Sequence, residues 1–310
     1  MFKYDEEVEP VWSRLEVVSK RSTTGEIVPL PRIRENWGSG GRSSTEVSDC
    51  RKHVRWHRDE PVTVIGRTVL IVQARMGSTR LPGKSMMSLA GEPMIVRILE
   101  RLLRCELPDD IVLAVPDQSQ DEILVDVGKQ CGVSVFRGPE HDLVDRYRQA
   151  AEMNDAELIV RVPADNVTPE PTEIDRIIEH HHTLPGRGFS SNLAEIWGSG
   201  YPDGIGAEVF DTSLLIEASD RHHMPTQREH VHRNFFDYET QKAVDEAWAP
   251  VSTVLCPLEF RRPDIVLDVN TKSQYQLMSR LYDDLYPNDP NFSIIEVISW
   301  MDQHQLIGEC

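Results

Sequence analysis

The sequence predicts an α/β fold, in which a doubly wound, mostly parallel sheet follows a flexible N-terminal extension. From residue 68 onward, short apolar runs rich in β-branched residues alternate with segments of helical period. Such runs are typical of strands buried on both faces, and helical connections between them favour parallel pairing. A glycine-containing loop with several cations follows the first run. Because right-handed crossovers place the carboxyl ends of parallel strands at one edge, we expect a ligand site there.

The elements of the first half can be assigned in order. The run Val69-Leu70-Ile71-Val72 predicts the first strand. Pro93 suits the first turn of the helix that follows, and Gly132 suits the end of the next helix. The complete predicted order is strand 69–72, helix 93–105, strand 111–115, helix 121–131, strand 133–136, helix 142–153 and strand 158–162.

The second half has a mixed pattern of strands and helices. Asp211 is a favourable N-cap residue for one of these helices. The predicted order is helix 171–181, strand 205–210, helix 211–218, helix 228–238, strand 251–256, strand 265–268, helix 271–286 and helix 293–305.

Residues 1–66 differ from the rest of the chain. They include a polar run rich in glycine and serine at 37–44 and show no sustained helical or strand period. This pattern predicts a mobile extension, with a small docking or oligomerisation arm as the alternative. We expect residues 67–310 to form one folded domain, which survives deletion of the extension.

The charge is distributed unevenly along the 310 residues. The formal net charge is −18, yet residues 1–66 hold 11 basic and 11 acidic side chains, so the whole excess lies in residues 67–310. Such an acidic body is a poor general partner for nucleic acid or for an anionic membrane. A small anion would need a local cluster of cations or a metal ion.

Hydropathy and cysteine usage favour a cytoplasmic protein. The mean hydropathy is −0.40, and no apolar run approaches the roughly 18 residues that a membrane span needs. The first ten residues are acidic and precede no apolar core, which disfavours a secretory signal. The five cysteines are widely spaced and form no CxxC pair, which disfavours disulfides and a structural zinc site.

The loop after the first strand has the composition of a polyphosphate site. It places Arg75, Arg80 and Lys84 within ten residues of an otherwise acidic body. Its glycines allow the backbone to approach a ligand closely, and Ser78 can donate to phosphate oxygens. Arginine offers a planar fork and lysine a point charge for phosphate. The spacing matches neither the P-loop nor the GxGxxG pattern. A basic surface loop without a ligand is the alternative.

Several ordered motifs resemble those of the cytidylyltransferases. They are most similar to the branch typified by spore-coat polysaccharide biosynthesis protein F, with the acylneuraminate and 3-deoxy-manno-octulosonate enzymes as more distant relatives. The resemblance covers roughly residues 68–286. It rests on IVQARMGSTRLPGK (71–84), VFRG (135–138), DLVDRY (142–147), VRVPADN (160–166), PDG (202–204), EVF (208–210) and REHV (228–231).

This resemblance implies a nucleotidyltransferase domain of the Rossmann-like or GT-A-like type. The implied reaction transfers CMP from CTP to a small-molecule acceptor and releases pyrophosphate, with Mg²⁺ as cofactor. Arg75, Arg80 and Lys84 would hold the triphosphate and, together with Asp165, act in catalysis. The resemblance places Gln73, Ala74, Arg75, Gly77, Ser78, Lys84, Asp117, Arg137 and Gly138 at the nucleotide. The match is weaker at Asp117, so base selection is less well defined than phosphate binding.

Two aspartates are the expected metal ligands. In the related octulosonate enzymes an Asp in each of two such strand-end positions holds magnesium, which implies this role for Asp165 and Asp268. Carboxylates beside phosphate oxygens are ligands that Mg²⁺ prefers. Asp165 is also compatible with a turn or a helix cap before Thr168, and Asp268 with an N-cap for the helix after Thr271. The second acidic residue that the family usually has after Asp268 is absent.

The acceptor side is less sharply defined. Glu or His could take a proton from an acceptor hydroxyl. The expected acceptor-binding residues are Asn166, Asn192, Asp203, Glu208, Glu229 and His230. For the last four, a structural hydrogen bond is an equally good interpretation.

Three acceptor classes and one non-enzymatic function stay open. The acceptor could be an acidic sugar of nonulosonate or octulosonate type, a phosphonate, or a sugar or polyol phosphate. A phosphorylated acceptor would need further cations from the second half. A catalytically silent nucleotide-binding scaffold is the alternative of another class. A homodimer is compatible with the sequence.

Overall fold

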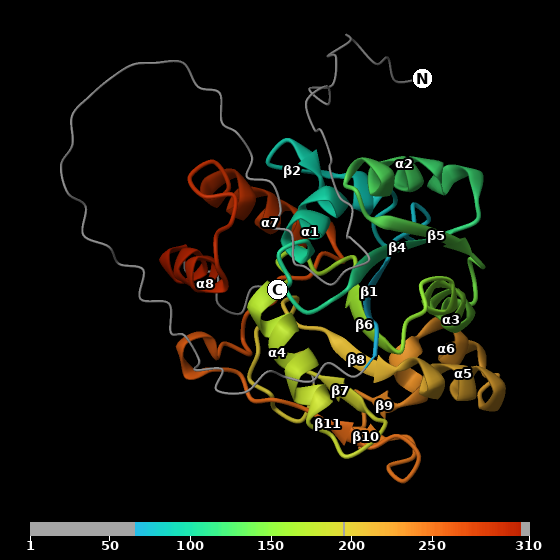
Figure 1. The fold of residues 1–310 in the computed structure, drawn as a ribbon. Helices are drawn as coiled ribbons and strands as arrows, with labels where there is room; N and C mark the ends of the chain where they lie inside the picture. Colours follow the sequence, from blue (N-terminus) through green and yellow to red (C-terminus); the bar gives the residue numbers. More distant parts are fainter. Residues whose placement is uncertain (1–65, 195, 305–310) are drawn as a thin grey trace, which may run out of the picture. The chain divides into compact units, whose positions relative to one another are not determined.

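The computed structural model describes residues 66–194 and 196–304 (Figure 1). The predicted extension lies outside the described residues except for Gly66, and the division into 1–66 and 67–310 stays a prediction. No helix of the described chain is long and apolar enough to cross a membrane.

A seven-stranded sheet forms the centre of the described domain, in the order β11-β7-β8-β6-β1-β4-β5. β1 lies between β4 and β6 and runs parallel to both, as Figure 1 shows. β8 alone is antiparallel to its neighbours, so the predicted mostly parallel sheet is confirmed. The strands are β1 (Thr68–Gln73), β4 (Asp110–Pro116), β5 (Ser134–Gly138), β6 (Leu158–Pro163), β7 (Phe189–Ser191), β8 (Glu208–Asp211) and β11 (Val251–Ser252).

Helices cover both faces of this sheet, because successive strand residues point to opposite sides. Leu70 and Val72 of β1 pack in the core with α1, α2, α4, α7 and α8. Val69 and Ile71 pack in the opposite core with α3 and α5. The helices are α1 (Met94–Leu102), α2 (Glu122–Gln130), α3 (Leu143–Met153), α4 (Pro171–His182), α5 (Thr212–Arg221), α6 (Pro225–Glu229), α7 (Lys272–Leu285) and α8 (Ile294–Gln303).

Short elements complete the described chain. Two small hairpins pair β2 (Ser88–Leu89) with β3 (Glu92–Pro93) and β9 (Phe236–Asp237) with β10 (Lys242–Ala243). Single 3₁₀ turns lie at Lys84–Met86, Ser119–Asp121, Val231–Asn234 and Leu258–Phe260.

Side chains define where several helices begin. Thr271 caps α7 through a capping box with Gln274, and Ser293 caps α8 in the same way. The Asp142 carboxylate accepts from the Asp145 amide at 2.9 Å and caps α3. Asp211 precedes α5 but accepts instead from the Gly188 amide, so its side chain is no cap.

Four predicted elements of the second half differ from the structure. The helix over 228–238 is wrong: α6 ends at Glu229, a 3₁₀ turn follows, and the chain then enters β9. The strand over 205–210 begins only at Glu208, after Gly204 with a φ of +94°. The strand over 251–256 ends at Ser252, and 265–268 forms isolated bridges rather than a strand. All four segments are short, so their local pattern is easily overridden by tertiary contacts.

Candidate active site

A cavity of about 750 Å³ opens at the carboxyl ends of β1 and β6. Gln73 and Pro163, the last residues of these two parallel strands, are direct register partners, so the loops that follow them emerge side by side. The predicted site residues that line the cavity are Gln73, Ala74, Arg75, Ser78, Arg80, Lys84, Asp165, Asn166, Asp203, Glu208, Glu229, His230 and Asp268. The structure therefore gathers most of the predicted residues around one space.

The first loop turns back on itself at the cavity rim. Gly83, with a φ of +71°, donates its amide to the Met76 carbonyl at 3.1 Å. This turn aims Lys84 inward, where its Nζ donates to Asp165 Oδ2 at 3.2 Å and to the Val269 carbonyl at 2.9 Å. Arg75 and Arg80 form no hydrogen bond or ion pair with the part of the chain that the structure describes. We call residues 73–84 with Asp165 and Asp268 the loop end of the cavity.

Asp165 and Asp268 face the cavity together. The Val269 amide donates to the Asp165 carbonyl at 2.9 Å, and Asn166 pairs with Asp268 in an isolated bridge. Burial raises the pKa of Asp268, and the nearby Asp165 carboxylate raises it further. Two carboxylates that repel each other beside open space are suited to a cation.

The helix-cap roles considered for these aspartates are filled by other residues, while Asp165 does lie in a turn, in which the Asn166 amide donates to the Pro163 carbonyl at 3.2 Å. Thr271, not Asp268, caps α7. The Asp268 carboxylate instead accepts from Gln274 Nε2 at 3.1 Å and from the side-chain Nδ2 of Asn270. Glu170 stands at the N-cap of α4, and Lys84 is the side-chain partner of the Asp165 carboxylate among described residues.

A buried network lies at the other end of the cavity. Arg161 on β6 is the direct register partner of Glu208 on β8, and its Nη1 donates to Glu208 Oε2 at 2.5 Å. The Tyr238 hydroxyl donates to Glu208 Oε1 at 2.9 Å. His232 Nδ1 lies 3.9 Å from the same oxygen. We call Arg161, Glu208, His232 and Tyr238 the inner network.

Burial and ion pairing fix the charge states of Arg161 and His232 in the inner network. Burial alone would lower the pKa of Arg161, but attraction to Glu208 outweighs it and raises that pKa. Burial lowers the pKa of His232 to about 4, so its ring is neutral at pH 7. Glu208, with an exposed fraction of 0%, is committed to Arg161 and Tyr238. Desolvation lowers the pKa of His230 on the cavity wall, which keeps that ring neutral at pH 7.

Comparison with known proteins now decides the family. The cytidylyltransferase family model matches residues 69–247, more than half of the chain. The chain belongs to the cytidylyltransferase family. The matched range holds every residue of the cavity except those near Asp268.

Individual relatives agree with this cytidylyltransferase assignment. Spore coat polysaccharide biosynthesis protein SpsF of Bacillus subtilis is 29% identical over 241 residues, which are 76% of this chain and 94% of that protein. The 3-deoxy-manno-octulosonate cytidylyltransferase of Trichlorobacter lovleyi is 34% identical over 119 residues, 38% of this chain and 46% of that enzyme.

Solved structures show the same fold. A cytidylyltransferase from Leptospira borgpetersenii superposes with a TM-score of 0.67 at 24% identity, covering 77% of this chain and 95% of the other. A CMP:2-keto-3-deoxy-manno-octonic acid synthetase solved with CTP gives a TM-score of 0.51 at 16% identity, covering 69% and 98%. These likenesses confirm the nucleotidyltransferase fold that the motifs imply.

Five predicted residues of the cytidylyltransferase do not line the cavity: Gly77, Asp117, Arg137, Gly138 and Asn192. Arg137 and Asp117 pair with each other at 2.9 Å on the surface. Asn192 is a correction, because it is fully buried and its amide is used by the backbone. Its Nδ2 donates to the Glu173 carbonyl and its Oδ1 accepts from the Ala207 amide, so the side chain is held inside the core and does not face the cavity.

The cavity also contains residues that the motifs did not single out: Glu140, His141, Arg146, Arg161, His232, Tyr238 and Asn270. The sequence did contain a signal for Arg161. It is a charged residue within a strand that the pattern predicts to be buried on both faces, and such a charge requires a partner. His232 lies two residues after His230, in a 3₁₀ turn within the segment that the sequence predicted as an α-helix.

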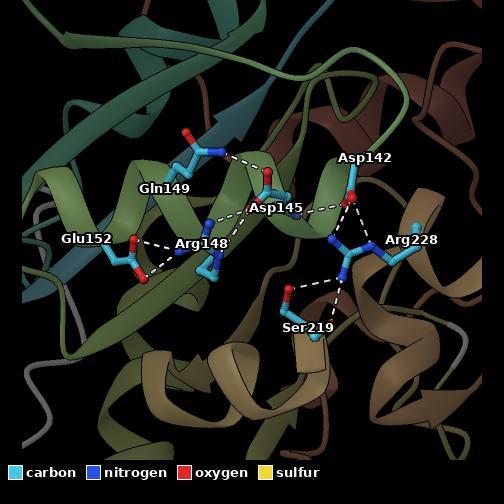
Figure 2. A network of polar contacts seen from close by, with 7 residues as sticks. All are labelled: Asp142, Asp145, Arg148, Gln149, Glu152, Ser219 and Arg228. Atoms are coloured by element: carbon cyan, nitrogen blue, oxygen red, sulfur yellow. Dashed lines mark hydrogen bonds and ion pairs between the residues drawn. The ribbon is translucent and has the colours of Figure 1, made fainter. Parts of the chain in front are cut away.

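An ion pair joins two elements that border the cavity, as Figure 2 shows. Arg228 of α6 donates to Asp142 Oδ2 through Nε at 2.9 Å and through Nη2 at 2.5 Å. Its Nη1 donates to the Ser219 carbonyl at 3.1 Å, so one guanidinium ties α6 to α3 and α5. Glu229 and His230 follow directly, and this contact therefore sets their place on the cavity wall.

Proposed function

We propose that this protein transfers CMP from CTP to a small acceptor, with release of pyrophosphate and with Mg²⁺ as cofactor. The observation that carries the proposal is the loop end, where two arginines without an ion-pair partner among the described residues lie in one cavity with two facing carboxylates. A protein of net charge −18 repels a triphosphate at long range, so binding requires such local cations.

The loop supplies the contacts for the triphosphate. Arg75 and Arg80 are free to form charge-assisted hydrogen bonds with phosphate oxygens, and Lys84 adds a point charge deeper in the cavity. Holding the phosphates in a fixed geometry aligns the α-phosphorus with the attacking oxygen. Contacts that strengthen as charge develops lower the barrier.

The residues present fit a magnesium ion. Asp165 and Asp268 would hold it, with the triphosphate and water completing the oxygen shell, as Mg²⁺ commonly requires. Among the described residues no group of three or more His, Cys, Asp or Glu gathers as a metal cluster, so the ion would depend on the nucleotide. When bound, it would neutralise charge at the α-phosphate. Lys84, which contacts Asp165, would keep this carboxylate turned toward the substrate.

The acceptor is assigned to the side of the cavity that carries His230 and the inner network. Neutral His230 is suited to take the proton of an acceptor hydroxyl. We assign an acidic sugar of octulosonate or nonulosonate type. No lysine or arginine of the described residues after Arg161 lines the cavity. This part of the cavity therefore suits an acceptor with a single carboxylate better than a phosphate-bearing acceptor, which would need added cations there.

A screen of pyrophosphate release tests the proposal. The full chain is incubated with Mg²⁺ and each of ATP, CTP, GTP and UTP, crossed with acidic sugars, phosphosugars and phosphonates. We expect turnover with CTP and an acidic sugar. Comparable turnover with UTP or GTP would contradict the assigned nucleotide. Tight CTP binding without turnover on any acceptor would favour the non-catalytic scaffold instead.

A further inference from the structure

Arg146 on α3 is a buried charge that the site described so far does not use. It lines the cavity with an exposed fraction of 3%. Its Nη1 donates to the Pro139 carbonyl at 3.2 Å, whereas Nε, itself buried, has no partner among the described residues. No carboxylate of the described residues forms an ion pair with it. A buried charge without an ion-pair partner is costly to a fold, which points to a ligand that completes it.

The neighbours of Arg146 strengthen this interpretation. Burial lowers its pKa, and the nearby Arg75 lowers it further. Asp121 and Glu140 are the acidic groups that act on Arg146. Asp121 Oδ1 already accepts from the Met76 amide at 2.6 Å. Two guanidiniums thus lie close enough to repel each other, which an anion between them would relieve.

Gly138, the last residue of β5, makes room for the Arg146 side chain. A Cβ at Gly138 would lie 3.1 Å from Arg146 Cγ and 2.6 Å from the Phe136 ring. A side chain at position 138 would therefore force the Phe136 ring and the stem of Arg146 to shift, so glycine leaves room for Arg146 to pass this strand end toward the cavity. This packing gives Gly138 a role although it does not line the cavity itself.

We infer that Arg146 and Arg75 form an anion-binding subsite that binds a phosphate or carboxylate group of a substrate. The inference rests on the proposed function, because both sources of that group are its substrates. The group belongs either to the triphosphate of CTP or to the acidic acceptor. Arg146 offers unused N–H donors to an oxyanion, and Arg75 supplies the second charge.

The test compares Arg146→Gln with Arg148→Gln in the full chain. Arg148 lies two residues further on α3, where it pairs with Asp145 and Glu152 away from the cavity (Figure 2). Affinities for tripolyphosphate, CTP and cytidine are measured by calorimetry, followed by the KM of the acceptor found in the screen. Melting temperatures report folding.

If the nucleotide supplies the anion, we expect Arg146→Gln to lower the affinities for tripolyphosphate and CTP by at least about tenfold. The affinity for cytidine should not change. If the acceptor supplies it, CTP affinity stays and the acceptor KM rises by a similar factor. Arg148→Gln should change neither. Arg146→Lys, which keeps the charge without the planar fork, should lie between wild type and Arg146→Gln.

Unchanged affinities and acceptor KM in folded Arg146→Gln would overturn the inference. Should that variant fail to fold, Arg146→Lys and Arg75→Gln decide, and wild-type affinities in both would overturn it equally. Absence of pyrophosphate release by the wild type defeats the proposed function instead. The tripolyphosphate titration still tests the subsite in that case.

Discussion

The loop end and the inner network use charge in opposite ways. At the loop end, Arg75 and Arg80 have no ionic partner within the described chain, and Asp268 is repelled by Asp165. In the inner network, Arg161 and Glu208 form an ion pair, and both side chains are buried. Unpaired charge around a cavity is available to a substrate, whereas paired buried charge fixes the shape of the wall.

This difference distinguishes residues that bind a substrate from residues that shape the cavity wall. Substituting a residue of the loop end should reduce turnover and leave the fold intact. Substituting a residue of the inner network should first reduce the free energy of unfolding. The following variants test that division, in order of expected size.

Glu208→Gln should cause the largest loss. It removes the partner of a guanidinium that is 8% exposed, and breaking a buried pair in this way typically costs about 3–5 kcal/mol. Denaturant unfolding measures the change. Glu152→Gln, in an exposed pair with Arg148, is the control and should cost less than about 1 kcal/mol. Equal stability of the two variants would show that the inner network is not structural.

Asp165→Asn should raise the activation barrier of CMP transfer without unfolding the protein. Asparagine keeps the shape but not the charge, so the loss of CTP-dependent pyrophosphate release should exceed about 2 kcal/mol, or about thirtyfold. Release is measured across a Mg²⁺ titration together with the melting temperature. Turnover near that of the wild type at low Mg²⁺ would remove Asp165 from the loop end as a functional residue.

His232 should make stability depend on pH. Its pKa falls from 6.5 to about 4 on folding, so the unfolded chain takes up the proton first as the pH drops. Stability present at pH 7 is therefore lost progressively between pH 6.5 and pH 4. At pH 5 the loss amounts to ~2 kcal/mol. Denaturant unfolding should show this extra loss in the wild type relative to His232→Gln, and parallel pH profiles would contradict it.

Arg228→Gln should have the smallest effect of the four. Its contact with Asp142 is partly exposed, so we expect a loss of about 1–2 kcal/mol in stability and a raised acceptor KM with an unchanged KM for CTP. Arg148→Gln on α3 should alter neither KM. A rise in the KM for CTP alone would show that α6 borders the nucleotide instead.

Local sequence was sufficient where a short segment carries its own pattern. The runs that became β1, β4, β5 and β6 are apolar and bounded by turns, and each was predicted to within two residues at either end. The loop over 73–84 holds its cations in one contiguous stretch, so its composition alone indicated phosphate binding. The helix predicted over 228–238 was wrong because its eleven residues carry only a weak helical pattern, which the contacts of a cavity wall override.

The sequence by itself therefore determined the order of strands and helices, the motifs of the family and the cation-rich loop. Only the tertiary structure decided that Arg161 lies opposite Glu208, 47 residues away, and that Asp268 meets Asp165. It also decided that Arg146 lines the cavity with an Nε that has no partner among the described residues. The physical reason is that ionic pairing between distant residues depends on strand order and register. These are set by the packing of the whole sheet and not by any local segment.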